Sequence, residues 1–460
     1  MEPRKRRFFN RCLTLWIFPA VIVGILPGLF IFGPSSLGAE TLTLEEALSR
    51  ALRNNPGILA RAHEIRAAEG ERRAARRALL PQLDLLAEAR RLSDPQAVTP
   101  IKGPGKFPAF SRDIYYAGVE LRLPLYEGGR LRSLVRLSGI RTVLAESLRR
   151  ETALDLLANV KGTYFMGLYL RGLIRARERV LAALKREEKD AALRLRVGRV
   201  PPLDLLRIKS RVKSEEAALA SARQALRRVK EALSVLMGEP PRSDFELSGN
   251  LTLIPLPREP EWERILSCLP EVEAARRELE AARERVRLER SGHLPRLDFL
   301  VDYGRRAGSG LHDDEEVWEA GFRLRLNLFS GGTISARVAA ARARELSARE
   351  RLRQVELSVR RRVLAALSES AEARARVRAL EAARQAAREA FRVESLRYRT
   401  GAGTVTDLLA AQAAWSETEA AYREALYRYA RALVSYQRAT GEVARGLLVL
   451  PCEGESHAQD

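Results

Sequence analysis

The side chains that most often carry chemistry form no catalytic or metal-binding pattern in this chain. The four histidines, at positions 63, 293, 312 and 457, lack the spacing of metal ligands. The sequence contains no G-x-S-x-G motif and no phosphate-binding P-loop, and its carboxylates pair only as on an ordinary helix surface. The acidic run 313–316 lies between two strand candidates and fits an extracellular loop better than a cation site. We therefore expect no enzyme activity, no metal ion and no cofactor.

Two aspartates, by contrast, occupy equivalent positions. Asp204 follows Gly198 by six residues, and Asp407 follows Gly401 by six. The two sets lie 203 residues apart (401 minus 198). A glycine that ends one helix in the left-handed conformation, with a carboxylate in the first turn of the next helix, explains this spacing structurally. The pattern predicts two sharp helical turns of the same design.

The correspondence extends along most of the chain, which is an internal repeat. A Leu-Pro-x-Leu segment at 80–83 returns at 294–297, an offset of 214. The offset falls to 203 further on, so the halves differ mainly by eleven extra residues between 90 and 114. Two corresponding glycine pairs mark turns from strand to helix: Gly128, Gly129, Gly331 and Gly332.

Long stretches of the chain favour helices. Residues 125–200 and 296–450 lack proline and are rich in Ala, Leu, Arg and Glu. Each long helix should contain about 68 residues and span roughly 100 Å at 1.5 Å per residue. Shorter helices should stack end to end in pairs beside the long ones, and the remaining pieces should meet near mid-height, where Thr43 and Glu46 supply a capping box. The shorter helices are expected at about 57–79, 204–237, 271–293 and 407–440.

Four segments alternate between apolar and polar residues: 83–90, 119–125, 297–303 and 318–328. A period of two is typical of transmembrane barrel strands, with one face toward lipid and the other toward water, or of a soluble sheet that buries the same face. The rest of the chain offers no layer to cover that face, which favours the membrane. Aromatic residues near the strand ends either form interfacial belts or pack at strand–helix corners: Tyr115, Tyr116, Tyr126, Trp318 and Phe329.

Four strands cannot close a barrel, and an open edge in hydrocarbon leaves backbone groups unpaired. The expected fold class is therefore mostly α with a small transmembrane β part. It has two structural repeats of long antiparallel helical hairpins. Three copies would complete a 12-stranded β-barrel and a 12-helix α-barrel as a homotrimer.

The N-terminus resembles a targeting segment, because basic residues precede the apolar run 13–32 and small residues follow it. We interpret 1–39 as a cleaved signal peptide; the alternative is a retained membrane anchor. The net charge of +21 (80 basic minus 59 acidic residues) is spread over helical stretches. It indicates solvated helix faces and no nucleic-acid partner, although a basic coiled-coil nucleic-acid binder is the alternative. Cys268 and Cys452 either pair or remain ordinary thiols.

The segment 42–56, which contains Leu-Thr-Leu-Glu-Glu-Ala-Leu and ends in Asn-Asn-Pro, resembles the N-terminal signature of the TolC-type outer-membrane efflux proteins. The Leu-Pro-x-Leu segments, the Gly-Gly pairs and the two Gly-to-Asp spacings also match that family. The resemblance implies an outer-membrane channel with a long periplasmic extension. Such a channel serves efflux or type I secretion and docks an inner-membrane transporter through a periplasmic adaptor. The adaptor class, which also has long hairpins, is the alternative.

The resemblance also assigns roles at the hairpin tips. Asp407, Tyr398 and Asp204 match gate positions, and Asp407 would form an acidic ring. Ala410 stands where the family has a second aspartate and Gly403 where it has an arginine, so we expect a gate with fewer polar links and weaker cation block. Six tip residues would contact the adaptor, or would only turn the chain: Val197, Gly198, Arg199, Thr400, Gly401 and Ala402.

The predicted division of the chain follows from these assignments. After the signal peptide come an N-terminal mid-height segment, repeat one, an equatorial linker, repeat two and an equatorial tail: 40–56, 57–238, 239–270, 271–441 and 442–460. The expected partners are two further copies, the adaptor, the inner-membrane transporter and outer-membrane lipid.

Overall fold

The computed structural model describes residues 40–101, 103–105, 107–257, 259–309, 311 and 314–447, which from Thr41 onward form one compact unit. The predicted signal peptide and Cys452 lie outside these residues. The elements in chain order are β1 (Glu40–Leu42), α1 (Leu44–Asn54), α2 (Pro56–Arg77), β2 (Gln82–Ala97), β3 (Phe110–Tyr126), α3 (Arg130–Arg196), α4 (Pro202–Leu236), β4 (Phe245–Leu247), α5 (Trp262–Cys268), α6 (Pro270–Arg290), η1 (Ser291–His293), β5 (Arg296–Ala307), β6 (Glu315–Arg325), α7 (Thr333–Thr400), α8 (Val405–Thr440) and η2 (Glu442–Ala444).

The two long helices have the predicted length. The helix α3 contains 67 residues and α7 contains 68. Each begins after a Gly-Gly pair whose second glycine is left-handed, with φ of 83° at Gly129 and 77° at Gly332. A side chain is strained in that conformation, so glycine is the residue that allows a strand to turn directly into a helix. Within the described residues, no helix is both long and apolar enough to cross a membrane.

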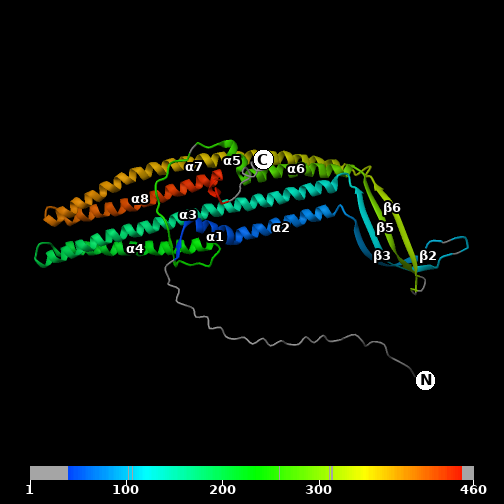
Figure 1. Ribbon diagram of the computed structural model, residues 1–460, viewed down its shortest axis with the longest axis horizontal. Coiled ribbons are helices and arrows are strands. Elements are labelled where there is room, and N and C mark those ends of the chain that lie inside the picture. Colours follow the sequence, from blue (N-terminus) through cyan, green and yellow to red (C-terminus); the bar gives the residue numbers. More distant parts are fainter. Residues whose placement is uncertain are drawn as a thin grey trace, which may run out of the picture. The chain divides into compact units, whose positions relative to one another are not determined.

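The short helices pack beside the long ones (Figure 1). The helices α2 and α4 both contact α3, while α6 and α8 both contact α7 and α3. At the junction of the first pair, the Asn55 side chain caps α2 and also donates from Nδ2 to the Leu236 carbonyl at the end of α4, at 3.0 Å. This contact confirms the expected end-to-end stacking, and it leaves α3 flanked along its whole length.

The mid-height core joins distant segments. Thr43 forms the predicted capping box with Glu46, which places Leu48 against α3. The Tyr164 hydroxyl lies 2.9 Å from the Leu42 carbonyl and 2.8 Å from that of Ser248. Since these residues come from 40–56, from the middle of α3 and from 239–270, the non-repeated segments meet around the long helix.

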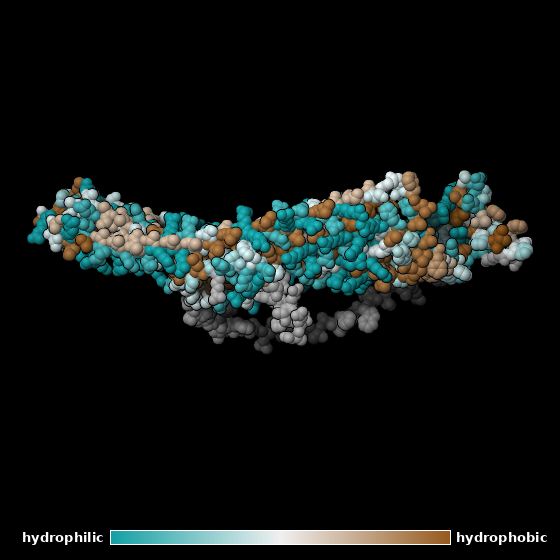
Figure 2. Space-filling view, turned by 90° about the horizontal axis from the view of Figure 1, so that it is seen from above, coloured by the Kyte–Doolittle hydropathy of each residue, from teal (hydrophilic) through white to brown (hydrophobic). Residues whose placement is uncertain are grey.

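The large sheet has the strand order β2-β3-β5-β6, with antiparallel pairing throughout. One face is apolar and open: Trp318 is 72% and Phe322 71% exposed. Figure 2 shows apolar surface gathered toward the sheet end of the molecule, whereas the rods are mostly hydrophilic. The predicted last strand, 318–328, lies three residues too late, because β6 runs from Glu315 to Arg325, where Arg325 pairs with Arg296. The residue before Arg296 is Pro295, which has no N–H with which to extend the ladder.

Candidate functional site

The predicted docking residues form two exposed turns at the far ends of the helical hairpins. Gly198 has φ of 73° and Gly401 φ of 82°, as expected for left-handed helix terminators. The Arg199 amide donates to the Arg194 carbonyl at 2.9 Å, and the Ala402 amide donates to the Arg397 carbonyl at 2.9 Å. A Cβ atom at either glycine would meet nothing within 4 Å, so backbone conformation alone selects glycine here.

The two aspartates begin the returning helices but are held differently. The Asp407 amide donates to the Thr404 hydroxyl at 3.2 Å, and that hydroxyl donates to the Asp407 carboxylate at 2.7 Å. Asp204 also lies in a first turn, but its helix α4 is preceded by Pro201, which offers no side-chain cap. Asp407 is solvent-exposed, while Asp204 is half-buried. Both carboxylates suit the positive end of a helix dipole.

The Tyr398 side chain packs between the two hairpins through its ring, not through a hydrogen bond of its hydroxyl. It is 5% exposed and belongs to a hydrophobic cluster with Leu184 and Leu408. Its hydroxyl has no hydrogen-bond partner, so no such bond joins it to Asp204. Burial raises the pKa of Tyr398, and the negative charge of Asp204 raises it further. The structure thus brings two of the predicted gate residues together by packing and charge.

A polar clamp that sequence reasoning missed joins α3 to α7 next to Tyr398. Arg194 donates to the main-chain carbonyls of Tyr398 and Arg399, both at 2.8 Å. Glu187, only 2% exposed, accepts from Arg399 at 2.6 Å and from the Ser395 hydroxyl at 2.9 Å. We call Glu187, Arg194, Ser395 and Arg399 the tip clamp. Its α3 members and its α7 members are about 200 residues apart in the chain, so no sequence spacing could have signalled it.

Two further contacts continue these links between the returning helices α4 and α8. Arg207 donates to the Thr406 hydroxyl at 3.2 Å, and Arg211 donates to the Gln412 side-chain oxygen at 2.7 Å. The expectation of few polar links considered only the positions at Gly403 and Ala410. Within one chain, other residues connect the two hairpins.

The strand-to-helix turns also contain an unpredicted acid. Glu127 is buried and lies 2.7 Å from Arg130, 3.9 Å from Arg122 and 3.9 Å from Arg296. The neighbouring Gly128 has φ of 60°, and a Cβ atom there would lie 2.7 Å from the Cβ of Leu294. Glu127 therefore ties the first turn to the start of β5 through arginines of both repeats.

A row of carboxylates crosses the polar face of the sheet. Asp84 pairs in register with Glu120, Glu120 with Asp302, and Asp302 with Glu319. None of the four makes a hydrogen bond or salt bridge within the described residues. We call this set the acidic row. Along each strand these carboxylates alternate with the residues of the open apolar face, so the acidic row lies on the opposite side of the sheet.

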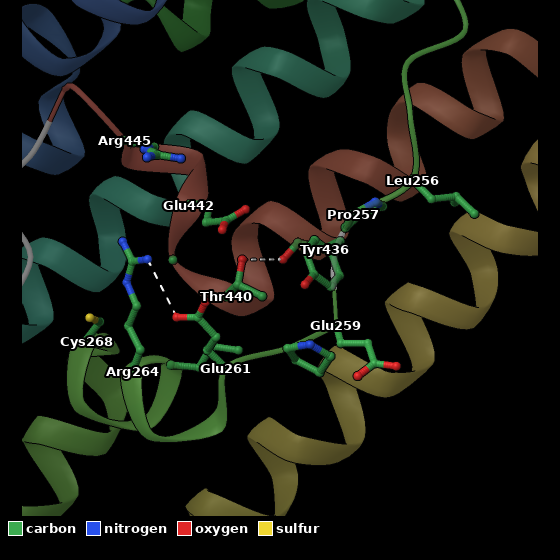
Figure 3. A pocket seen from close by; sticks show the side chains of 13 residues that line it. Leu256, Pro257, Glu259, Glu261, Arg264, Cys268, Tyr436, Thr440, Glu442 and Arg445 are labelled. Carbon is green, nitrogen blue, oxygen red and sulfur yellow. Dashed lines mark hydrogen bonds and ion pairs between the residues drawn. The ribbon is translucent and has the colours of Figure 1, made fainter.

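A cavity of about 560 Å³ lies at mid-height between the equatorial linker, α5 and the end of α8 (Figure 3). Glu261 and Arg264 form a 3.9 Å ion pair there, and the Thr440 hydroxyl donates to the Tyr436 carbonyl at 3.0 Å. Cys268, which also lines the cavity, is disulfide-bonded. No group of three or more His, Cys, Asp or Glu residues in the described part of the chain is arranged to hold a metal ion.

Two helical hairpins extend from one end of an antiparallel sheet whose apolar face is uncovered. This arrangement defines a class of outer-membrane channels with long helical extensions. The sequence model of the outer membrane efflux protein family matches residues 47–239 and 263–442, and the chain belongs to that family. The protein is thus an outer-membrane efflux channel with a periplasmic extension, and the adaptor alternative is excluded.

Individual relatives match this chain over most of their own length. The chain is 25% identical over 379 residues to the cobalt-zinc-cadmium resistance protein CzcC of Cupriavidus metallidurans, with 81% of this chain and 84% of the relative covered. It is 24% identical over 413 residues to the outer membrane protein TolC of Escherichia coli, with 85% and 80% covered. A crystal structure of a membrane protein from Pseudomonas aeruginosa has the same fold, with a TM-score of 0.75, 23% identity, and 86% and 90% covered.

Proposed function

We propose that three copies of the chain close a 12-stranded barrel and a 12-helix tunnel. The observation that carries this proposal is the pair of open sheet edges, because β2 and β6 each have only one neighbour in the large sheet. Edges in hydrocarbon leave unsatisfied backbone groups that cost several kcal/mol each. Pairing β6 of one copy with β2 of the next removes every open edge.

The helical part supports the same closure. The helix α7 exposes Leu346, Leu357 and Leu364, which follow one another at intervals of eleven and seven residues. This spacing keeps them on one side of a supercoiled helix, where a neighbouring rod would cover them. On α4, Leu203, Leu206 and Val235 are also exposed. The α7 leucines lie roughly 54–81 Å from the tip turn, whereas α4 reaches only from the tip to mid-height, so in a closed tube a different rod of the next copy would cover each set.

In the trimer the chain acts as a passive exit duct, and an inner-membrane transporter docks through a periplasmic adaptor. The tip turns 197–199 and 400–402 contact that adaptor, and Asp407, Tyr398 and Asp204 surround the constriction. CzcC is named for resistance to cobalt, zinc and cadmium. We propose that the partner transporter selects the cargo here, since the duct itself offers no metal-ligand set among the described residues.

Fractionation and sizing test the closure. Outer-membrane recovery of a heat-resistant trimer, with conductance in planar bilayers, is the expected result. A folded, monomeric sample that is soluble without detergent would overturn the proposal. For docking, photo-crosslinkers placed at Ala402 should capture a periplasmic adaptor in intact cells, whereas crosslinkers at the mid-height Arg264 should not.

A further inference from the structure

A groove opens between α3 and α7 just above the tips, with α8 as its floor, and encloses about 860 Å³. Seven arginines but only three glutamates line it. One glutamate, Glu187, is buried within the tip clamp. Another, Glu419, is also buried and is surrounded by Arg423 at 3.1 Å, Arg179 at 3.6 Å and Arg384 at 3.7 Å. Two of the three acids therefore lie deep in the groove and are already neutralised, while the third, Glu389, is exposed and pairs with Arg392 at 2.6 Å.

Positive charge is left at the rim. Arg186 on α3 and Arg388 on α7 are exposed, and neither makes a hydrogen bond or ion pair with the described residues. They stand on opposite walls of the same groove. An unpaired arginine offers five N–H donors in a planar fork that matches a carboxylate. The groove thus presents two free carboxylate-binding groups on either side of its floor.

The interior of the groove also has an apolar strip. Phe391 and Trp415 stack with ring centroids 5.1 Å apart, and Leu396 is 59% exposed beside them. Trp, Phe and Arg together are the composition of protein–protein interface centres, whereas a small anion needs only the charges. On α7 the groove runs from residue 384 to 399, about 22 Å of helix at 1.5 Å per residue. Those dimensions fit a helix of about four turns.

The direction in which the groove opens follows from α8. At about 100° per residue, Trp415 and Glu419 lie roughly 80° and 120° around α8 from Asp407. The groove residues of α8 thus point roughly a quarter to a third of a turn away from Asp407. In the trimer proposed above Asp407 faces the axis, so the groove is turned away from the axis.

We infer that the groove receives an amphipathic helix of the periplasmic adaptor whose apolar stripe is flanked by Asp or Glu residues. Its carboxylates pair with Arg186 and Arg388, and its apolar stripe covers Trp415 and Leu396. This assignment rests on the proposed docking function and adds to it the chemistry of the partner's surface. Opposite charges at the rim mainly accelerate association and select the partner.

The test measures binding of the purified adaptor, identified by the tip crosslink, to the purified trimer in detergent. The variant is the double charge reversal Arg186→Glu with Arg388→Glu. Its matched control is Arg175→Glu with Arg378→Glu, two exposed arginines on the same helices that do not line the groove. We expect the groove variant to bind about tenfold more weakly at low salt and to lose most of its salt dependence, while the control changes less than about twofold.

The outcomes separate the two proposals. If the wild-type trimer fails to bind the adaptor, the docking function itself is wrong. If the wild type binds and the groove variant binds equally well, docking stands and the groove assignment falls. Each variant must elute as a trimer with wild-type helix content, so a folding defect is recognised before binding is compared. A Leu396→Asp substitution gives a second arm and should also weaken binding, because covering the new carboxylate with an apolar stripe would cost its desolvation.

Discussion

Replacement of Glu187 by glutamine is the sharpest perturbation of the tip clamp. Glutamine keeps the size of the side chain and can still accept from Ser395 and Arg399, but it removes the buried negative charge. A hydrogen bond to a charged group contributes about 1.5–3 kcal/mol and a neutral one about 0.5–1.5 kcal/mol. Because the Arg399 side chain is 47% exposed, solvent screens part of this difference. We therefore expect Glu187→Gln to weaken the tip clamp by about 1 kcal/mol in each chain.

The effect of Glu187→Gln on channel opening depends on how many copies of the chain open together. If the three tips open together, the closed state loses about 3 kcal/mol, which changes the closed-to-open ratio on the order of 100-fold. The assay is single-channel recording in planar bilayers, with Glu187→Gln expected to raise the open fraction or the conductance. Glu188→Gln is the matched control, since Glu188 makes no hydrogen bond or salt bridge within the described residues.

A double-mutant cycle with Arg399→Ala shows whether the effect passes through the pair. Residues in direct contact should give non-additive changes. Unchanged recordings for Glu187→Gln in a folded trimer, or strictly additive effects of the two substitutions, would refute the clamp as a closing device.

Four other predictions concern the same duct. Asp407→Ala should reduce block by divalent cations, and the wild-type block should be weaker than in a relative with two ring aspartates; equal block would contradict the single-ring expectation. Gly401→Val should lose adaptor docking and export, because a β-branched residue at φ of 82° is strained by about 1–2 kcal/mol or more; intact export would remove the assignment. Glu120→Gln combined with Asp302→Asn should lower the cation preference measured by reversal potential, since the acidic row then loses half its charge per chain; an unchanged potential would place the row outside the conduction path. Burial of neutral Tyr398 contributes stability below pH of about 10, its unfolded pKa, and this contribution is lost as pH rises through the raised folded pKa; conductance recorded from about pH 9 to 11 should therefore increase, and less so in Tyr398→Phe.

Much of the fold was predictable because its signals are local. The proline-free stretches, the Gly-Gly pairs at the helix starts and the tip glycines Gly198 and Gly401 together predicted the lengths of α3 and α7 to within a residue or two. The alternation of apolar residues located the four strands of the large sheet, although the last was placed three residues too far along the chain. These features depend on residues that are neighbours in the chain, where propensity and periodicity act directly.

The candidate site was only partly predictable. The turn residues Gly198 and Gly401 and the first-turn aspartates could be placed, because a helix terminus has a composition of its own. The tip clamp could not, since Glu187 and Arg399 resemble any other charged residues on a helix surface. The acidic row was equally hidden, because it appears only once the strand registers align Asp84, Glu120, Asp302 and Glu319.

The sequence alone determined that this protein consists of two repeats of long rods and short strands, with too few strands to close a barrel. The tertiary structure decided which charges are buried, which pair across the two hairpins and which remain free at the rim of a groove. The physical reason is the distance along the chain over which each kind of interaction acts. Backbone conformation responds to the nearest few residues, whereas the energy of a charge depends on the burial and on the partners that folding brings to it from 200 residues away.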